Sequence, residues 1–136
     1  MRPTELVGRG EGGRNGARMM KQLSVQIFGV KGSQATRAAE RFFKERSVAI
    51  HFVDLKQKPM APGEIKRFID RFTLLGMLDT ESKAYENAGL KYLRQSEGEL
   101  LKKIEREPAL LRLPLVRADK RISIGQDDAA WKAMLD

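Results

Sequence analysis

The first part of the chain alternates between a hydrophobic period typical of strands and one typical of helices. From Leu23 to Phe28 apolar and polar residues alternate, and the pattern ends at Gly29, which predicts a strand with one face on a core. Over Ser33 to Arg46 apolar residues recur at helical spacing, which predicts a helix with a charged outer face. The apolar positions of this helix are Ala35, Ala38, Ala39, Phe42 and Phe43.

A second strand and a second helix follow in the same order. Val48 to Leu55 is an apolar run of strand length, and Pro59 and Pro62 then break the chain. The stripe of the next helix is formed by Ile65, Phe68, Ile69 and Phe72. The order strand, helix, strand, helix predicts a parallel crossover unit.

The second half is predicted to be mainly helical at first. Residues 74–93 contain short helix-compatible pieces that Gly76 and Gly89 interrupt. Ser96 to Glu107 fits a longer helix that ends before Pro108. The buried side of this helix is predicted to be Leu100, Leu101 and Ile104.

The last part of the chain has the pattern of a hairpin and a closing helix. Leu115 to Ala118 and Arg121 to Ile124 read as two short strands around a turn at Asp119-Lys120. Gln126 to Leu135 then fits a helix that carries Trp131, which we expect to be a packing residue.

Composition limits the chemistry of this chain. Its 136 residues, 41% hydrophobic and 32% charged, suit one globular domain. There is no cysteine and one histidine, His51, so we predict no metal site, no cofactor and no thiol catalysis. No apolar stretch reaches the ~18 residues of a membrane span. We expect a cytoplasmic protein without membrane contact. We also expect His51 either to face solvent or to be hydrogen-bonded.

Net charge is +8, but its distribution argues against direct nucleic-acid binding. Residues 1–22 hold five basic and two acidic residues, a net +3, which leaves +5 for the rest of the chain. There the basic residues are interspersed with many acidic ones, as on an ordinary solvated surface. Weak steering of polyanions needs only net charge and stays open.

The N-terminal residues lack the pattern of a folded segment. Residues 1–18 contain five of the twelve glycines and no apolar period, so we expect residues 1–19 to form a flexible tail and residues 20–136 to form the domain. Met19 and Met20 stand just before the first predicted strand. Either one of them is the natural start, which we favour, or the tail is a basic arm with a function.

Four segments, in this order and spacing, resemble the arsenate reductase (ArsC) and Spx family. They are Phe28–Ser33 with Thr36–Ala39; Val53–Leu55 with Pro59 and Gly63–Ile65; Asp79–Tyr85 with Gly89–Leu90; and Glu107–Val116 with Ile124–Gly125 and Trp131. The resemblance implies a thioredoxin-like α/β fold, with a mixed four-stranded sheet, flanking helices and a helical insertion between a βαβ half and a ββα half. It also implies that Pro114 is a cis-proline facing the active site.

The chain departs from that family where catalysis is expected. By resemblance, Ser33 occupies the position of the reactive cysteine at a helix start. Glu81 replaces a family arginine, and Leu113 replaces the arginine before the proline, although Arg112 one position earlier can partly substitute. A serine hydroxyl cannot cycle through a disulfide, so we expect no reductase activity and no catalytic residue.

The candidate ligand-binding residues are Lys31, Gly32, Ser33, Arg37, Arg112 and Pro114. The simplest interpretation of Ser33 is a helix N-cap, and the simplest role of Pro114 is to shape a strand end. The functional interpretation is that amides at the helix start, beside Lys31 and Arg37, hold an anion or a partner carboxylate.

Two functions stay open. One is a non-catalytic binding or regulatory protein with a protein partner, which the resemblance to Spx makes RNA polymerase by analogy. The other is a residual oxyanion- or glutathione-binding protein related by descent to arsenate reductases.

Overall fold

The computed structural model describes residues 23–90 and 94–136, so the predicted tail over 1–19 lies outside the described residues. These residues form a four-stranded mixed sheet of order β2-β1-β3-β4. The strands are β1 (Ser24–Gly29), β2 (Ala49–Asp54), β3 (Leu115–Ala118) and β4 (Arg121–Ile124). β1 pairs in parallel with β2, which confirms the predicted crossover unit, and antiparallel with β3. β3 pairs antiparallel with β4, which confirms the predicted hairpin.

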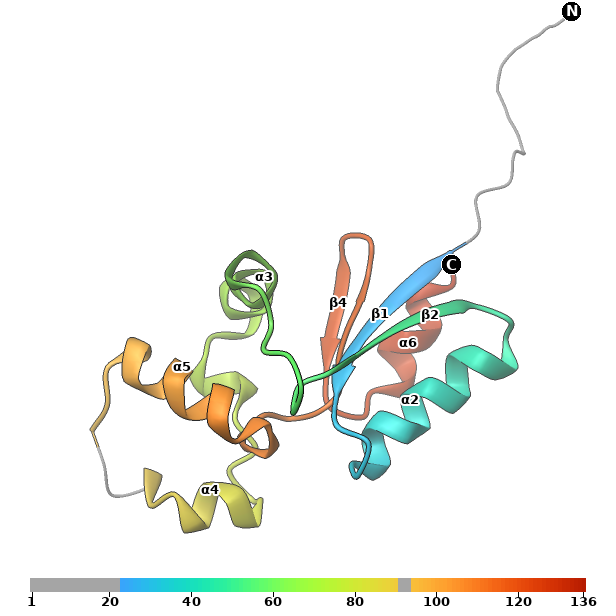
Figure 1. Ribbon diagram of the computed structural model, residues 1–136. Helices are drawn as coiled ribbons and strands as arrows, with labels where there is room; N and C mark the ends of the chain where they lie inside the picture. The colour runs from blue at the N-terminus through green and yellow to red at the C-terminus, as the bar shows by residue number, and fades with distance from the viewer. Residues whose placement is uncertain (1–22, 91–93) are drawn as a thin grey trace, which may run out of the picture.

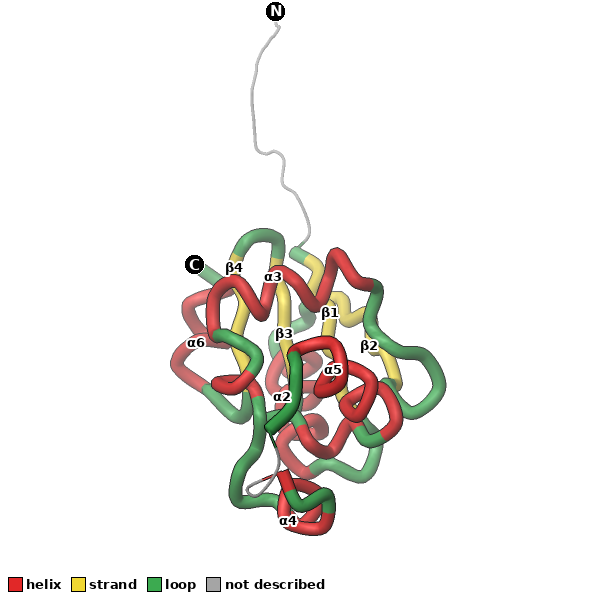
Figure 2. Tube along the Cα trace, turned by 90° about the vertical axis from the view of Figure 1, so that its left-hand side faces the viewer, coloured by secondary structure: helices red, strands yellow, loops and turns green. Residues whose placement is uncertain are grey.

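Helices cover both faces of the sheet (Figure 1). The helices are α2 (Gln34–Glu45), α3 (Pro62–Phe72), α4 (Lys83–Asn87), α5 (Glu97–Arg106) and α6 (Asp128–Met134), with 3₁₀ turns η1 (Leu75–Met77) and η3 (Pro108–Leu110). α2 and α6 lie on one side of the sheet, and α3 and α5 lie on the other. In Figure 2, which is turned to the second side, α3 and α5 lie in front of the strands.

The face under α2 and α6 has a small aromatic core. Phe43 of α2 is fully buried, and Trp131 of α6 packs against it with ring centroids 6.2 Å apart. Phe42 contacts the same indole ring edge-on, at 5.6 Å between centroids. The helical stripe predicted from the sequence therefore meets the last helix through edge-on and tilted aromatic rings, a stabilising type of core contact.

The opposite face is covered by the helical insertion between β2 and β3. α3, η1, α4, α5 and η3 all lie within it, as predicted, although residues 91–93 of the predicted helical pieces lie outside the described residues. Phe68 of α3 is fully buried and meets Phe28 of β1 edge-on. α5 begins with a complete capping box, in which Ser96 and Glu99 bond to each other's backbone N–H groups.

The two strands of the hairpin have the predicted ends, and the ends of the other predicted elements differ by at most two residues. The closing helix starts at Asp128 rather than Gln126, because the side chain of Asp127 caps it by accepting from the N–H of Ala130 at 3.1 Å. Between β3 and β4 the turn residue Asp119 has φ of +58°, a left-handed conformation that aspartate tolerates better than most residues. No helix in the described ranges is long and apolar enough to cross a bilayer.

Candidate functional site

Strand register brings the two predicted loops to one end of the sheet. Phe28 of β1 is paired antiparallel with Leu115 of β3. The next residue outward on each strand is Gly29 and Pro114 respectively, so the chain leaves the sheet at the same end in both places. The loop that leads to Ser33 and the loop that carries Arg112 and Pro114 are therefore neighbours, as the resemblance implies.

Ser33 is the N-cap of α2. Its backbone is extended, with φ of −82° and ψ of 123°, and its Oγ accepts from the N–H of Thr36 at 3.1 Å. Its own N–H donates to the carbonyl of Val30 at 3.1 Å, which closes the loop before the helix. The hydroxyl is thus engaged in capping, and the hydrogen bonds of the described residues give it no basic partner that could activate it.

Two amides at the start of α2 are available to a ligand. The N–H groups of Gln34 and Ala35 donate no hydrogen bond among the described residues, as is usual for the first turn of a helix. Lys31 and Arg37 flank this turn, are exposed, and form no ion pair with another described residue. Orphan amides and two cations at a helix N-terminus favour an anion.

Close packing fixes the position of this helix start on the sheet. Gly29 lies so near Thr36 that a Cβ at position 29 would be 2.7 Å from Thr36 Cγ2 and would also clash with Thr36 Oγ1. Thr36 is fully buried, and its hydroxyl has no hydrogen-bond partner among the described residues. The glycine of the loop motif is therefore required here by a side chain of the helix rather than by a positive φ.

Arg112 is held by the helical insertion. Its N–H donates to the carbonyl of Met77 at 2.8 Å and its Nε donates to the carbonyl of Leu78 at 3.0 Å. Its own carbonyl accepts from the N–H of Gly125 at 2.8 Å. The backbone of Arg112 is thus fixed, and the outer nitrogens of its exposed guanidinium have no partner among the described residues.

The bond between Leu113 and Pro114 is cis, as the resemblance implies. Both residues are buried. The N–H of Leu113 donates to the carbonyl of Leu111 at 2.9 Å, and the carbonyl of Pro114 accepts from the N–H of Gly125 at 3.0 Å. The N–H of Leu113 and the carbonyl of Pro114 are therefore both engaged inside the chain.

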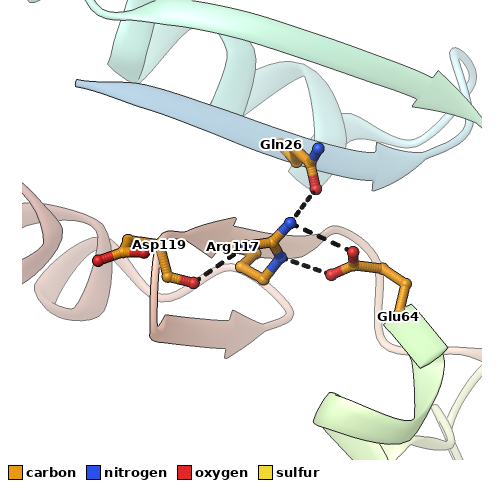
Figure 3. Close-up of polar contacts among 4 residues, drawn as sticks. All are labelled: Gln26, Glu64, Arg117 and Asp119. Carbon is orange, nitrogen blue, oxygen red and sulfur yellow. Dashed lines mark hydrogen bonds and ion pairs between the residues drawn. The ribbon is translucent and has the colours of Figure 1, made fainter. Parts of the chain in front are cut away.

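Sequence reasoning missed a charged cluster on the inner side of α3 (Figure 3). Arg117 of β3 donates to both carboxylate oxygens of Glu64, at 2.5 and 3.2 Å, and to Oε1 of Gln26 at 2.8 Å. The side chains of Arg117 and Glu64 are only 20% and 16% exposed. Because one guanidinium binds both oxygens of the Glu64 carboxylate and also reaches Gln26 of β1, this cluster joins the start of α3 to the sheet.

The described residues contain few other groups suited to catalysis or to metal binding. His51 is exposed, as predicted. Residues 23–90 and 94–136 contain no group of three or more side chains suited to hold a metal ion. The hydrogen bonds that Glu99 accepts from the backbone and hydroxyl of Ser96 hold the pKa of that carboxyl below its ordinary value of 4.5, which reflects capping of α5 and not catalysis.

The ArsC family model matches residues 28–134, a span that begins at the motif around Ser33 and ends in the last helix. The chain belongs to the ArsC family. The family predicted from the order of the four segments is therefore confirmed.

The curated relatives of this ArsC-family chain include both a regulator and enzymes. It is 28% identical over 111 residues to global transcriptional regulator Spx 2 of Oceanobacillus iheyensis, covering 78% of this chain and 81% of that protein. It is also 28% identical over 105 residues to an arsenate reductase of Neisseria meningitidis, covering 75% and 90% of the two chains.

Solved structures of the family share the fold. An arsenate reductase from Vibrio cholerae superposes with a TM-score of 0.68 at 16% identity, covering 85% of this chain and 98% of that one. The predicted thioredoxin-like sheet with its helical insertion is thus confirmed.

Proposed function

We propose that this ArsC-family chain is a binding or regulatory protein that performs no thiol redox chemistry of its own. One observation carries the proposal: the helix start where the resemblance puts a reactive cysteine holds Ser33, whose hydroxyl caps α2, in a chain without any cysteine. Disulfide exchange and reduction through a thiol adduct both need a thiolate. A serine hydroxyl that caps a helix supports neither reaction.

A protein partner is the first candidate for what this chain binds. The name of its relative Spx 2 describes a global transcriptional regulator, so RNA polymerase is the first protein to test. The surface available at the predicted site is formed by Lys31, Arg37 and Arg112, all exposed. A carboxylate-bearing segment of the partner suits these three cations. The cytoplasmic location stays a prediction.

Binding of an oxyanion or glutathione is the second candidate. It is favoured by the N–H groups of Gln34 and Ala35 beside Lys31, which donate no hydrogen bond within residues 23–90 and 94–136. Such a site would need no thiol. Glu81, which replaces a family arginine, is exposed and removes one cation from it.

An amide NMR titration of the full chain with arsenate, phosphate and glutathione distinguishes the two candidates. Saturable shifts confined to residues 31–37 and 112–115 would favour the small-molecule site, whereas no shift at millimolar ligand would leave the protein partner. Titration with purified RNA polymerase then tests the first candidate by line broadening at the same residues.

A parallel assay tests the absence of thiol chemistry. Formation of arsenite from arsenate with glutathione should not exceed the protein-free rate, and a protein-dependent rate would overturn the proposal. Ser33→Cys serves as the control for site geometry, because a cysteine at this helix start should have a thiol pKa below the usual ~8.5.

A further inference from the structure

An apolar groove runs between α3 and α5, on the face of the sheet opposite α2. Its volume is about 380 Å³, and its floor includes Leu55, Ile104 and Leu111, which are all buried. The residues that line its walls and rim are Pro59, Met60, Pro62, Ile65, Lys66, Ile69, Asp70, Glu97, Leu101, Glu105 and Pro108. A hollow of this size and character is typical of a ligand or peptide site.

The groove arises because each helix has a wider apolar stripe than its contact with the core uses. In α3, Phe68 points into the core and is fully buried, while Ile65 and Ile69 beside it are only half-buried. In α5, Ile104 is buried and Leu101 is half-buried. The half-buried side chains of the two helices face the groove and leave apolar surface that a partner can cover.

The rim of the groove is acidic, although the chain as a whole carries +8. Four charged residues line it, and the ammonium of Lys66 is bonded to the carboxylate of Asp70 at 2.8 Å. Once that pair is set aside, the remaining charges are the carboxylates of Glu97 and Glu105, both exposed and both on α5. The groove therefore offers apolar walls under two negative charges.

The spacing of these groups on α5 defines a matching partner. Glu97, Leu101 and Glu105 recur every four residues, so they share one face of the helix. At 1.5 Å of rise per residue, the two carboxylate positions are about 12 Å apart along the axis, with the leucine between them. A partner helix lying along α5 matches this pattern when one of its faces is apolar and carries two basic residues about two turns apart, one near each end.

We propose that the groove between α3 and α5 binds an amphipathic helical segment of a partner protein, with leucine-like side chains in the groove and a basic residue opposite each of Glu97 and Glu105. Helix-in-groove binding uses apolar anchors for affinity and rim charges for register. The groove lies on the other face of the sheet from Ser33, so this inference goes beyond the proposed function and holds or fails independently of it.

The probe for this surface is a fluorescein-labelled, alanine-rich peptide of about 14 residues with leucines on one face and a lysine at each end of that face. Anisotropy of the full-length protein with this peptide at low salt should show saturable binding. Reversing the groove charges with E97K and E105K together should weaken binding about tenfold, since each contact changes from attraction to repulsion. The same peptide with glutamates in place of lysines should bind the double variant more tightly than the unchanged protein.

Two further variants separate the groove from general charge and from folding. E45K and E86K together make the same change of net charge at exposed positions outside the groove lining, and should weaken binding much less. Leu101→Gln keeps every charge but removes an apolar anchor, and should weaken binding about fivefold or more. Circular dichroism checks that each variant is folded.

Three results would overturn the proposal. They are no saturable binding of the lysine peptide, equal losses in the groove and control charge variants, or equal binding of the lysine and glutamate peptides to the unchanged protein. If the charge reversals unfold α5, Leu101→Gln and the peptide charge swap on the unchanged protein decide the matter. Chemical-shift changes confined to 62–70 and 97–108 would place the peptide in the groove, and changes elsewhere would contradict the placement.

Discussion

The two faces of the sheet differ in how completely their helices close them. Under α2 and α6, Phe43 and Trp131 fill a small core, and both are at most 1% exposed. Under α3 and α5, the buried residues are more numerous but Ile65, Ile69 and Leu101 stay half-buried around a groove. We call the first face the closed face, although Phe42 at its edge is half-buried, because its aromatic rings pack on one another and the apolar groove lies on the second face.

This difference follows from how each face is built. α2 is the crossover helix between the adjacent parallel strands β1 and β2, and its first turn packs closely against β1 through Gly29 and Thr36. The opposite face is covered by the long insertion between β2 and β3, of which α3 is joined to the sheet by the pair Arg117–Glu64. Helix length does not explain the difference, because α3 and α5 have 11 and 10 residues while α2 and α6 have 12 and 7. What differs is that half-buried side chains of α3 and α5 line a groove instead of packing on one another.

The largest effect should come from opening the closed face. Trp131→Ala removes an indole that packs against Phe42 and Phe43, and should lower the free energy of unfolding by about 3–5 kcal/mol. Urea unfolding measures this loss in the free energy of unfolding. Leu101→Ala in the groove is the matched comparison and should cost about 1 kcal/mol, because its side chain is already partly exposed. Equal losses would show that the two faces are closed to the same degree.

A smaller effect is expected at the contact between β1 and α2. Gly29→Ala places a methyl group against Thr36, and should destabilise the protein by about 2–3 kcal/mol. Thr36→Ala in the same chain removes the clashing atoms. The double variant should therefore lose less stability than the two single variants lose together. Unfolding curves of all four proteins test this, and strict additivity would contradict the contact.

On the groove side, the test is the charged anchor of α3. Glu64→Gln leaves the guanidinium of Arg117 largely buried beside a neutral amide, and should cost about 2 kcal/mol. Replacing both residues, as E64L with R117M, should cost less than the two single changes together. Hydrogen exchange of α3 should rise in Glu64→Gln more than that of α2, and an even rise would show that the pair does not anchor α3 specifically.

Ser33→Ala removes the cap of α2 on the closed face. The loss should be about 1 kcal/mol, since the N–H of Thr36 loses its acceptor. Ser33→Asp keeps an acceptor and should lose only a few tenths. Thermal unfolding compares them, and a loss in Ser33→Asp as large as in Ser33→Ala would mean that the hydroxyl has a role other than capping.

The smallest effect is the pH dependence of the cap of α5 beside the groove. The pKa of Glu99 is lower in the folded protein than its ordinary value of 4.5. The stability that Glu99 contributes to the protein is therefore fully present above pH 4.5 and is lost as the pH falls through the lower folded pKa. The protection factor of the Ser96 amide, which is its exchange rate relative to the intrinsic rate at the same pH, should therefore fall at acid pH in the wild type. Glu99→Ala should lack this protection at every pH, and the same acid-induced loss of protection in that variant would contradict the assignment.

Much of the candidate site followed from local sequence. The turn at Gly29 and the helix stripe after Ser33 predicted a helix start, and the structure has Ser33 as its cap. The contacts of Arg112 could not be predicted, because its Nε bonds to Leu78, 34 residues earlier in the chain. The hydrogen bond that the N–H of Leu113 makes within its own loop could not be predicted either, because it depends on the path of the chain into β3.

The sequence by itself determined the order of strands and helices and the absence of a thiol at the helix start, because hydrophobic period and residue type act locally. Only the tertiary structure decided that Arg117 meets Glu64, 53 residues away, and that α3 and α5 leave a groove with two carboxylates on its rim. A helical stripe shows which side of a helix is apolar. How much of that side is covered depends on neighbours far along the chain, and that is set by packing in three dimensions.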